Sequence, residues 1–93
     1  MLTLEACKAL KALGYPQADP EYSDCRTPMQ RVGDDQGWYA CPDSIDALDW
    51  LAEPLHGVWY HFADGLYGLL WDEGSEFAPT PSALIVAVAQ ALA

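Results

Sequence analysis

Five residues of this 93-residue chain could in principle make a zinc site: Cys7, Cys25, Cys41, His56 and His61. Structural zinc sites usually take closely spaced pairs of ligands. The cysteines show no C-x-x-C spacing, and a predicted turn and strand start separate the two histidines. This spacing disfavours zinc, and we predict that the protein holds no metal and no cofactor.

A thiol–imidazole pair is the arrangement that would make the chain an enzyme. Cys41 lies just before a predicted helix, whose dipole could lower a thiol pKa. His61 follows on a predicted strand. Such catalysis also needs an orienting group and an oxyanion hole, and neither has a sequence signature here. We therefore predict a non-enzymatic protein and keep a small hydrolase that uses Cys41 and His61 as a third hypothesis.

A tryptophan beside three acids is the candidate binding site. Asp46, Asp49 and Glu53 fall within a narrow arc on the polar side of a predicted helix, and Trp50 lies next to them. Tryptophan is enriched at binding hot spots, and neighbouring acids can steer a basic partner. We predict that these four residues bind a partner. The alternative is that Trp50 packs under a hairpin and the acids are only the solvated side of the helix.

The charge of the chain is one-sided. Fourteen acidic residues face four basic ones, which gives a formal net charge of −10. Binding to nucleic acid or to an anionic membrane needs a basic patch, so we predict neither. A basic protein partner fits this charge. The second hypothesis is therefore an acidic inhibitor that imitates nucleic acid and occupies the basic groove of a defence enzyme or toxin.

Cysteine usage and hydropathy indicate the compartment. An odd number of cysteines is atypical of a secreted disulfide scaffold. No signal peptide is visible, and the longest uncharged apolar stretch, residues 83–93, is shorter than the roughly 20 residues that span a bilayer. We predict a reduced, cytoplasmic protein.

Three helices are predicted from their start and stop signals. The first is capped by Thr3 and stopped by Gly14. The second starts at residues 42–44 and runs to about residue 53, before Pro54, with an apolar stripe that includes Ile45. The third opens at residues 80–81 and is apolar almost all round, so it should be buried on more than one side.

Two hairpins are predicted between the helices. The first joins residues 29–32 and 38–41 around a loop at 33–37, after a polar loop at 16–28. The second joins residues 58–63 and 66–71 through Asp-Gly at 64–65, a dipeptide typical of a two-residue turn. That turn would pair Tyr60 with Leu69 and place both on one face. A polar loop is predicted at 72–76.

The predicted fold is therefore a single α+β domain over residues 1–93, with antiparallel β-hairpins packed with three helices in the order α-β-β-α-β-β-α. Neither face of the second hairpin is polar, and three short helices would leave apolar surface uncovered. We therefore predict a homodimer, formed through a sheet face or the last helix.

The two ends of the chain resemble small proteins of unknown function that bacteriophages and prophages encode. The resemblance lies in Leu-Gly-Tyr-Pro-Gln at 13–17, after the first helix, and in Thr-Pro-Ser-Ala-Leu at 80–84, before an alanine-rich helix. It implies an origin and assigns no catalytic residue. Our first hypothesis is a protein-interaction or structural protein of a phage or mobile element.

Overall fold

The computed structural model describes residues 2–17, 30–34 and 37–93. Its elements are α1 (Leu4–Ala12), β1 (Gln30–Asp34), β2 (Gly37–Cys41), α2 (Ser44–Leu55), β3 (Val58–His61), β4 (Tyr67–Trp71), β5 (Gly74–Ala78) and α3 (Pro81–Leu92). Strands β1 and β2 form a two-stranded antiparallel sheet, and β3, β4 and β5 form a three-stranded antiparallel sheet with β4 in the centre. The predicted α+β class is confirmed, with one strand more than predicted.

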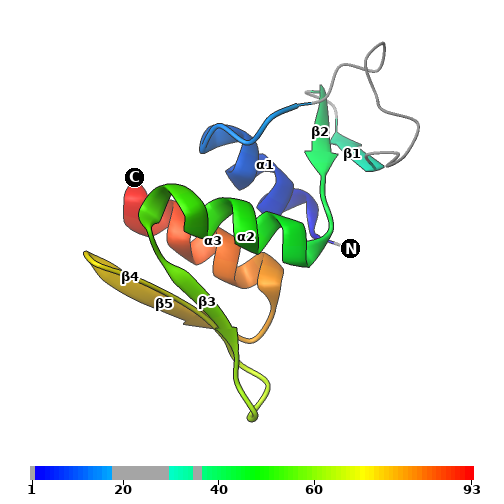
Figure 1. Ribbon diagram of the computed structural model, residues 1–93. Coiled ribbons are helices and arrows are strands. Elements are labelled where there is room, and N and C mark those ends of the chain that lie inside the picture. The colour runs from blue at the N-terminus through cyan, green and yellow to red at the C-terminus, as the bar shows by residue number, and fades with distance from the viewer. Residues whose placement is uncertain (1, 18–29, 35–36) are drawn as a thin grey trace.

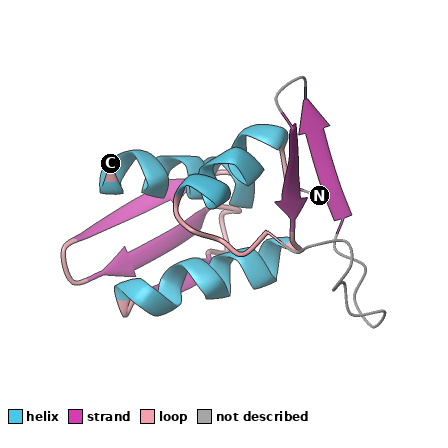
Figure 2. Cartoon of the chain, turned by 90° about the horizontal axis from the view of Figure 1, so that it is seen from above, coloured by secondary structure: helices cyan, strands magenta, loops and turns pink. Residues whose placement is uncertain are grey.

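The two sheets lie at opposite ends of the molecule, with the helices between them (Figures 1 and 2). Helix α1 packs on the two-stranded sheet. Helices α2 and α3 cover one face of the three-stranded sheet, which we call the inner face. No helix or strand among the described residues packs on the opposite face of that sheet (Figure 1).

Helix α3 is the centre of the core. It packs against α1, α2, β4 and β5, and its side chains Leu84, Ile85 and Val88 are fully buried. The predicted burial of this helix on more than one side is confirmed. Helix α3 touches several layers, so it needs apolar residues around most of its circumference. This accounts for the apolar composition of the helix.

Side-chain caps start α1 and α3 where the sequence predicts them. The Thr3 hydroxyl accepts a hydrogen bond from the Ala6 N–H at 3.2 Å, and the Thr80 hydroxyl accepts one from the Ala83 N–H at 3.1 Å. Both bonds satisfy a donor that has no partner inside the helix. At the other end of α1, Gly14 has a φ of 98° and ends the helix as predicted.

The second helix ends later than predicted. Pro54 lies inside its last turn, and the helix continues to Leu55. A proline removes one backbone donor, but it stops a helix only where the following residues also leave the helical conformation. Here the helix ends at His56, whose φ of 53° is left-handed, and the Gly57 N–H closes the turn on the Ala52 carbonyl at 2.9 Å.

Replacing His56 with glycine is expected to raise the free energy of unfolding by about 1 kcal/mol, because a side chain at this left-handed position carries a steric cost that glycine avoids. Gly14 is the matched control: it occupies the equivalent position at the end of α1, with φ 98°, so Gly14→Ala should cost about 1 kcal/mol. Urea denaturation of both variants checks the opposite signs. A loss of stability in His56→Gly would show that the imidazole makes favourable contacts that outweigh the strain.

The hairpin of β3 and β4 differs from the prediction by one residue in register. Tyr60 pairs with Gly68 and Trp59 with Leu69, so the predicted pairing of Tyr60 with Leu69 is wrong. The loop has three residues, 63–65, and not two. It is closed by the Phe62 N–H, which donates to the Leu66 carbonyl at 2.8 Å, and Gly65 takes the left-handed position of a bulged turn at φ 94°.

This one-residue shift moves every side chain of β4 to the opposite face relative to β3. Leu69 shares the inner face with Trp59 and is fully buried there. Leu70 shares the outer face with Val58 and is exposed. The shift buries Leu69 under the helices and leaves a continuous apolar row on the uncovered face of the sheet.

Residues predicted as a polar loop at 72–76 contain the start of β5. The chain reverses through Asp72 and Glu73, and Trp71 pairs with Gly74. Polar residues conceal this strand, because Ser75 and Glu76 interrupt the apolar pattern that signals a half-buried strand.

The first hairpin is present and longer than predicted, since β1 extends to Asp34 and β2 starts at Gly37. The Gln17 side chain, at the start of the preceding loop, accepts a hydrogen bond from the Ala40 N–H of β2 at 2.8 Å. Most of the loop predicted at 16–28 lies outside the described residues.

None of the helices in the described part of the chain is long and apolar enough to cross a membrane.

Candidate functional site

The outer face of the three-stranded sheet carries an uninterrupted set of exposed apolar side chains. We use the name outer face for Val58, Tyr60, Phe62, Leu66, Leu70 and Phe77. Val58 pairs with Leu70, Tyr60 with Gly68, and Gly68 with Phe77, and paired residues point to the same face of the sheet. Each of the six is 37 to 52% exposed. The solvent face of an antiparallel sheet is normally polar, so this face departs from the usual alternation.

Three rings cluster in the middle of the outer face, and two of them, Phe62 and Phe77, lie over Gly68. The centroid of the Phe62 ring lies 5.9 Å from that of Tyr60 and 5.9 Å from that of Phe77. A Cβ added to Gly68 would lie 2.8 Å from ring atoms of both phenylalanines. The glycine therefore leaves room for the two rings to lie against the strand.

The predicted binding residues of α2 lie as follows. Asp46 and Glu53 are exposed on the outward side of the helix. Trp50 is half-buried, and its ring packs edge-on against Tyr15 with 4.9 Å between centroids and 71° between planes. Burial, and secondarily the charge of Asp46, raises the pKa of the Tyr15 phenol. The structure thus joins Trp50 and Asp46 to the segment that follows α1, a contact that the helical pattern alone does not reveal.

The remaining predicted acid is engaged by the sheet. Asp49 accepts a hydrogen bond from the indole N–H of Trp59 on β3 at 2.6 Å. Ile45 of the predicted apolar stripe is 56% exposed, so its assignment to the buried side is wrong. The buried side of α2 is centred on Ala47 and Leu51, which places Ile45 at its margin. The four predicted binding residues share one region of α2, and their role in binding stays a prediction.

The residues of the hydrolase hypothesis have separate surroundings. Cys41 is buried beside α1, where its thiol donates to the Leu2 carbonyl at 3.8 Å. His61 is exposed at the end of β3, where its ring stacks on Tyr67 at 4.2 Å between centroids. Neither contact joins the thiol to the imidazole. The partner of Cys41 in the core is a second thiol, that of Cys7.

Burial, and then the hydrogen bond and charge of Cys41, raise the pKa of the Cys7 thiol to about 12 from an ordinary value of 9.0. Above pH 9 the unfolded chain loses this proton while the folded protein keeps it. The free energy of unfolding should therefore fall, by up to about 1 kcal/mol for each pH unit as the pH rises above 9, and this contribution should be complete below pH 9. Urea titrations at pH 8 and pH 10 measure the fall. In the Cys7→Ala control the fall should be smaller by about that amount; an equal fall in both proteins would contradict the assignment.

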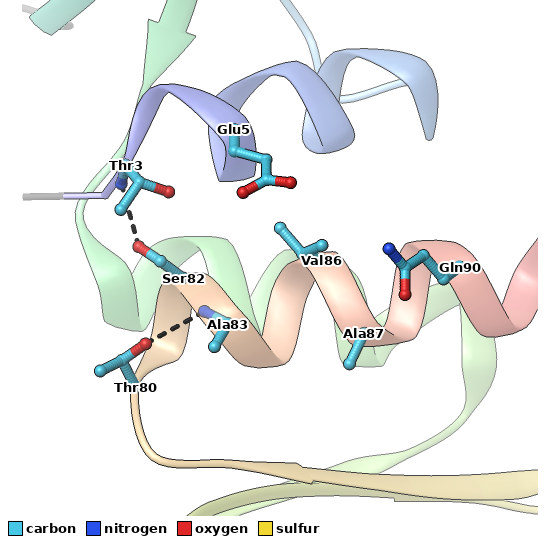
Figure 3. A pocket seen from close by; sticks show the side chains of 8 residues that line it. All are labelled: Thr3, Glu5, Thr80, Ser82, Ala83, Val86, Ala87 and Gln90. Carbon is cyan, nitrogen blue, oxygen red and sulfur yellow. Dashed lines mark hydrogen bonds between the residues drawn. The ribbon is translucent and has the colours of Figure 1, made fainter.

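A shallow groove of about 320 Å³ lies between the start of α1 and the length of α3. Figure 3 shows the residues that line it, which are Thr3, Glu5, Thr80, Ser82, Ala83, Val86, Ala87 and Gln90. The Thr3 N–H donates to the Ser82 hydroxyl across the groove at 3.0 Å, which ties the two helix starts together. The lining holds one carboxylate and neither a histidine nor a cysteine, so it offers no pair of groups for acid–base or nucleophilic chemistry.

Sequence reasoning predicts apolar hairpin faces but misses how far the outer face extends. Ser75 and Phe77 belong to β5; Ser75 lies in the segment predicted as a polar loop, and Phe77 was assigned to no element. The signal that could have located them is the Asp-Glu dipeptide at 72–73, followed by alternation that brings Phe77 and Ala78 to opposite faces. Among the described residues, no group of three or more His, Cys, Asp and Glu side chains is placed to hold a metal ion.

Comparison of the chain with protein-family models, with curated proteins and with solved structures found no match.

Proposed function

We propose that this is a non-enzymatic protein-interaction protein whose binding surface is the outer face of the three-stranded sheet. The observation that carries the proposal is the outer face itself: six large apolar side chains stand 37 to 52% exposed on one side of a sheet, in a chain with a formal net charge of −10. Exposed apolar side chains are normally scattered singly, and a contiguous patch marks an interaction site.

The composition and rigidity of the outer face support binding. Aromatic residues are enriched in the cores of protein interfaces, and charged residues are depleted there. Tyr60, Phe62 and Phe77 form such an aromatic centre, in which Phe62 contacts both other rings and lies with Phe77 over Gly68; contacts of this kind lower the ordering cost of binding. The resemblance of the chain's ends to phage and prophage proteins favours a role in the assemblies of such an element. We also propose a cytoplasmic location, where Cys7 and Cys41 stay as buried free thiols.

The acidic side of α2 supports a second candidate, the inhibitor that imitates nucleic acid. Asp46 and Glu53 are exposed along one side of this helix, and Asp49 is held between them by Trp59. A row of fixed carboxylates on a strongly acidic domain could occupy a basic groove. Binding of that kind weakens steeply as salt rises, because the interacting charges are exposed.

Site-specific photo-crosslinking distinguishes the two surfaces. A benzophenone side chain is placed at Tyr60 on the outer face, at Glu53 on α2 or at Gln90, an exposed position on α3 that serves as control. In lysate of the organism that encodes the chain, the proposal expects protein adducts at position 60 that persist at high salt, and few at position 90. Adducts confined to position 53 and abolished by salt would favour the inhibitor. Equal, weak labelling at all three positions would contradict both.

A further inference from the structure

We infer that the occupant of the outer face is a second copy of this chain, so that two three-stranded sheets pack face to face about a twofold axis. The resulting dimer has four layers: helices, sheet, sheet and helices. This inference rests on the proposed function and names the partner at the same surface. A closed twofold interface uses one self-complementary patch on both subunits, so the patch must tolerate its own image.

The distribution of charge meets that requirement. The chain has a formal net charge of −10, so most pairs of faces from two copies would bring like charges together. Eight outward positions, on the three strands and at the two residues that flank the β3–β4 loop, contain no acid and no base; they are Val58, Tyr60, Phe62, Leu66, Gly68, Leu70, Ser75 and Phe77. A face built for a basic partner would carry acids, and the acids of the neighbouring elements lie elsewhere, such as Asp49 and Glu53 on α2.

The size of the face also suits a dimer. Aromatic side chains present roughly 150–250 Å² each and aliphatic ones somewhat less, so three of each kind that are about half exposed offer on the order of 500 Å² of surface, most of it apolar. A standard interface buries about 800 Å² on each partner, and about 65% of a homodimer interface is apolar, which corresponds to about 520 Å². The outer face therefore supplies nearly the whole apolar part of one half of such an interface.

Acids at the two ends of the sheet set the salt dependence. Asp64 lies in the turn between β3 and β4, and Asp72 and Glu73 form the turn between β4 and β5. In a face-to-face dimer these turns bring like charges to the rim, where their repulsion is exposed and is screened by salt. Dimerisation should therefore strengthen as salt rises, which is the opposite of the salt dependence expected for a basic partner.

Sedimentation equilibrium of the full chain tests the inference, from about 1 to 500 μM protein at low and high salt. The expected result is a concentration-dependent rise from the monomer mass of 10.2 kDa to twice that mass, with a smaller dissociation constant at high salt. A mass of 10.2 kDa at every concentration and both salts would overturn the inference. If Tyr60 nevertheless crosslinks to a different chain, the proposed function stands and only the identity of the partner fails.

The variant Tyr60→Glu/Phe77→Glu localises the interface, because it places two like charges of each copy at the centre of the outer face. Its dimer dissociation constant should rise by about 100-fold or more. The matched control is Ile45→Glu, an equally drastic change at an apolar side chain that is 56% exposed on α2; it should leave the dimer intact. Phe77→Ser gives the same test without added charge if the double variant unfolds, as judged by circular dichroism. Dimerisation that survives both outer-face variants, or that is lost in Ile45→Glu, would overturn the inference.

Discussion

Leu69→Ala is expected to lower the free energy of unfolding by about 3 kcal/mol, whereas Leu70→Ala, one residue later on the same strand, is expected to lower it by less than about 1 kcal/mol. The two side chains are identical in size and lie in the central strand β4. They differ in the face to which they point: Leu69 is completely buried under the helices, and Leu70 is 39% exposed on the outer face.

The loss at Leu69 combines two costs. The shorter side chain buries less apolar surface on folding. The space that the leucine filled also becomes a cavity, because α3 and the central strand are held by their packing and cannot move in to fill it. A domain of this size has roughly 5–10 kcal/mol of stability in total, so the change removes a large share of it. Urea denaturation at a protein concentration low enough to keep the chain monomeric measures both variants.

The same pair of variants separates stability from association. Leu70→Ala should weaken the proposed dimer while leaving the monomer nearly as stable as the original protein. Leu69→Ala should destabilise the monomer while leaving the outer face unchanged. Equal losses of stability at the two positions would contradict the register in which Trp59 pairs with Leu69.

Gly57→Ala is expected to lower the free energy of unfolding by about 2–3 kcal/mol, the second largest loss of stability expected for a substitution. A Cβ at this position would lie 2.7 Å from the carbonyl oxygen of Leu70 and 3.2 Å from the Cβ of Trp71. Both neighbours are fixed, since Leu70 and Trp71 are held by pairing with β3 or β5. The clash can therefore be relieved only by moving the connection between α2 and β3 away from the sheet.

Gly65 provides the control for Gly57. A Cβ there would meet nothing within 4 Å, but its φ of 94° makes any side chain strained. Gly65→Ala should therefore cost about 1 kcal/mol, from backbone strain alone. Thermal or urea unfolding of the two variants compares steric crowding with strain; a smaller loss at Gly57 than at Gly65 would show that the α2–β3 connection has room to move.

The extent to which this fold could be predicted depended on whether a signal was local. Helix starts at Thr3 and Thr80 and the helix stop at Gly14 are determined by residues within one turn, and all three are confirmed. The register of the β3–β4 hairpin is not local in the same sense. The Asp-Gly dipeptide is compatible with a two-residue or a three-residue loop, and burial of Leu69 against the helices decides between them.

The candidate surfaces show the same division. The apolar character of the hairpin is visible in the sequence, and it led to the prediction of a homodimer. Phe77 belongs to β5, a strand that its polar residues make hard to recognise in the sequence. The full extent of the outer face is therefore known only once β5 is seen to pair with β4. The packing of Trp50 on Tyr15 joins residues 35 positions apart, and the bond from Trp59 to Asp49 joins two elements; neither has a pattern that a helical wheel displays.

The central position of α3 has a consequence for the synthesis of the protein. This helix touches α1, α2 and the three-stranded sheet, yet it is the last of the described elements to leave the ribosome. Until residues 81–92 emerge, the nascent chain exposes the inner face of the sheet as well as the outer one. Folding of this domain is therefore completed late, and a nascent chain stalled before α3 is the form most exposed to chaperones and proteases.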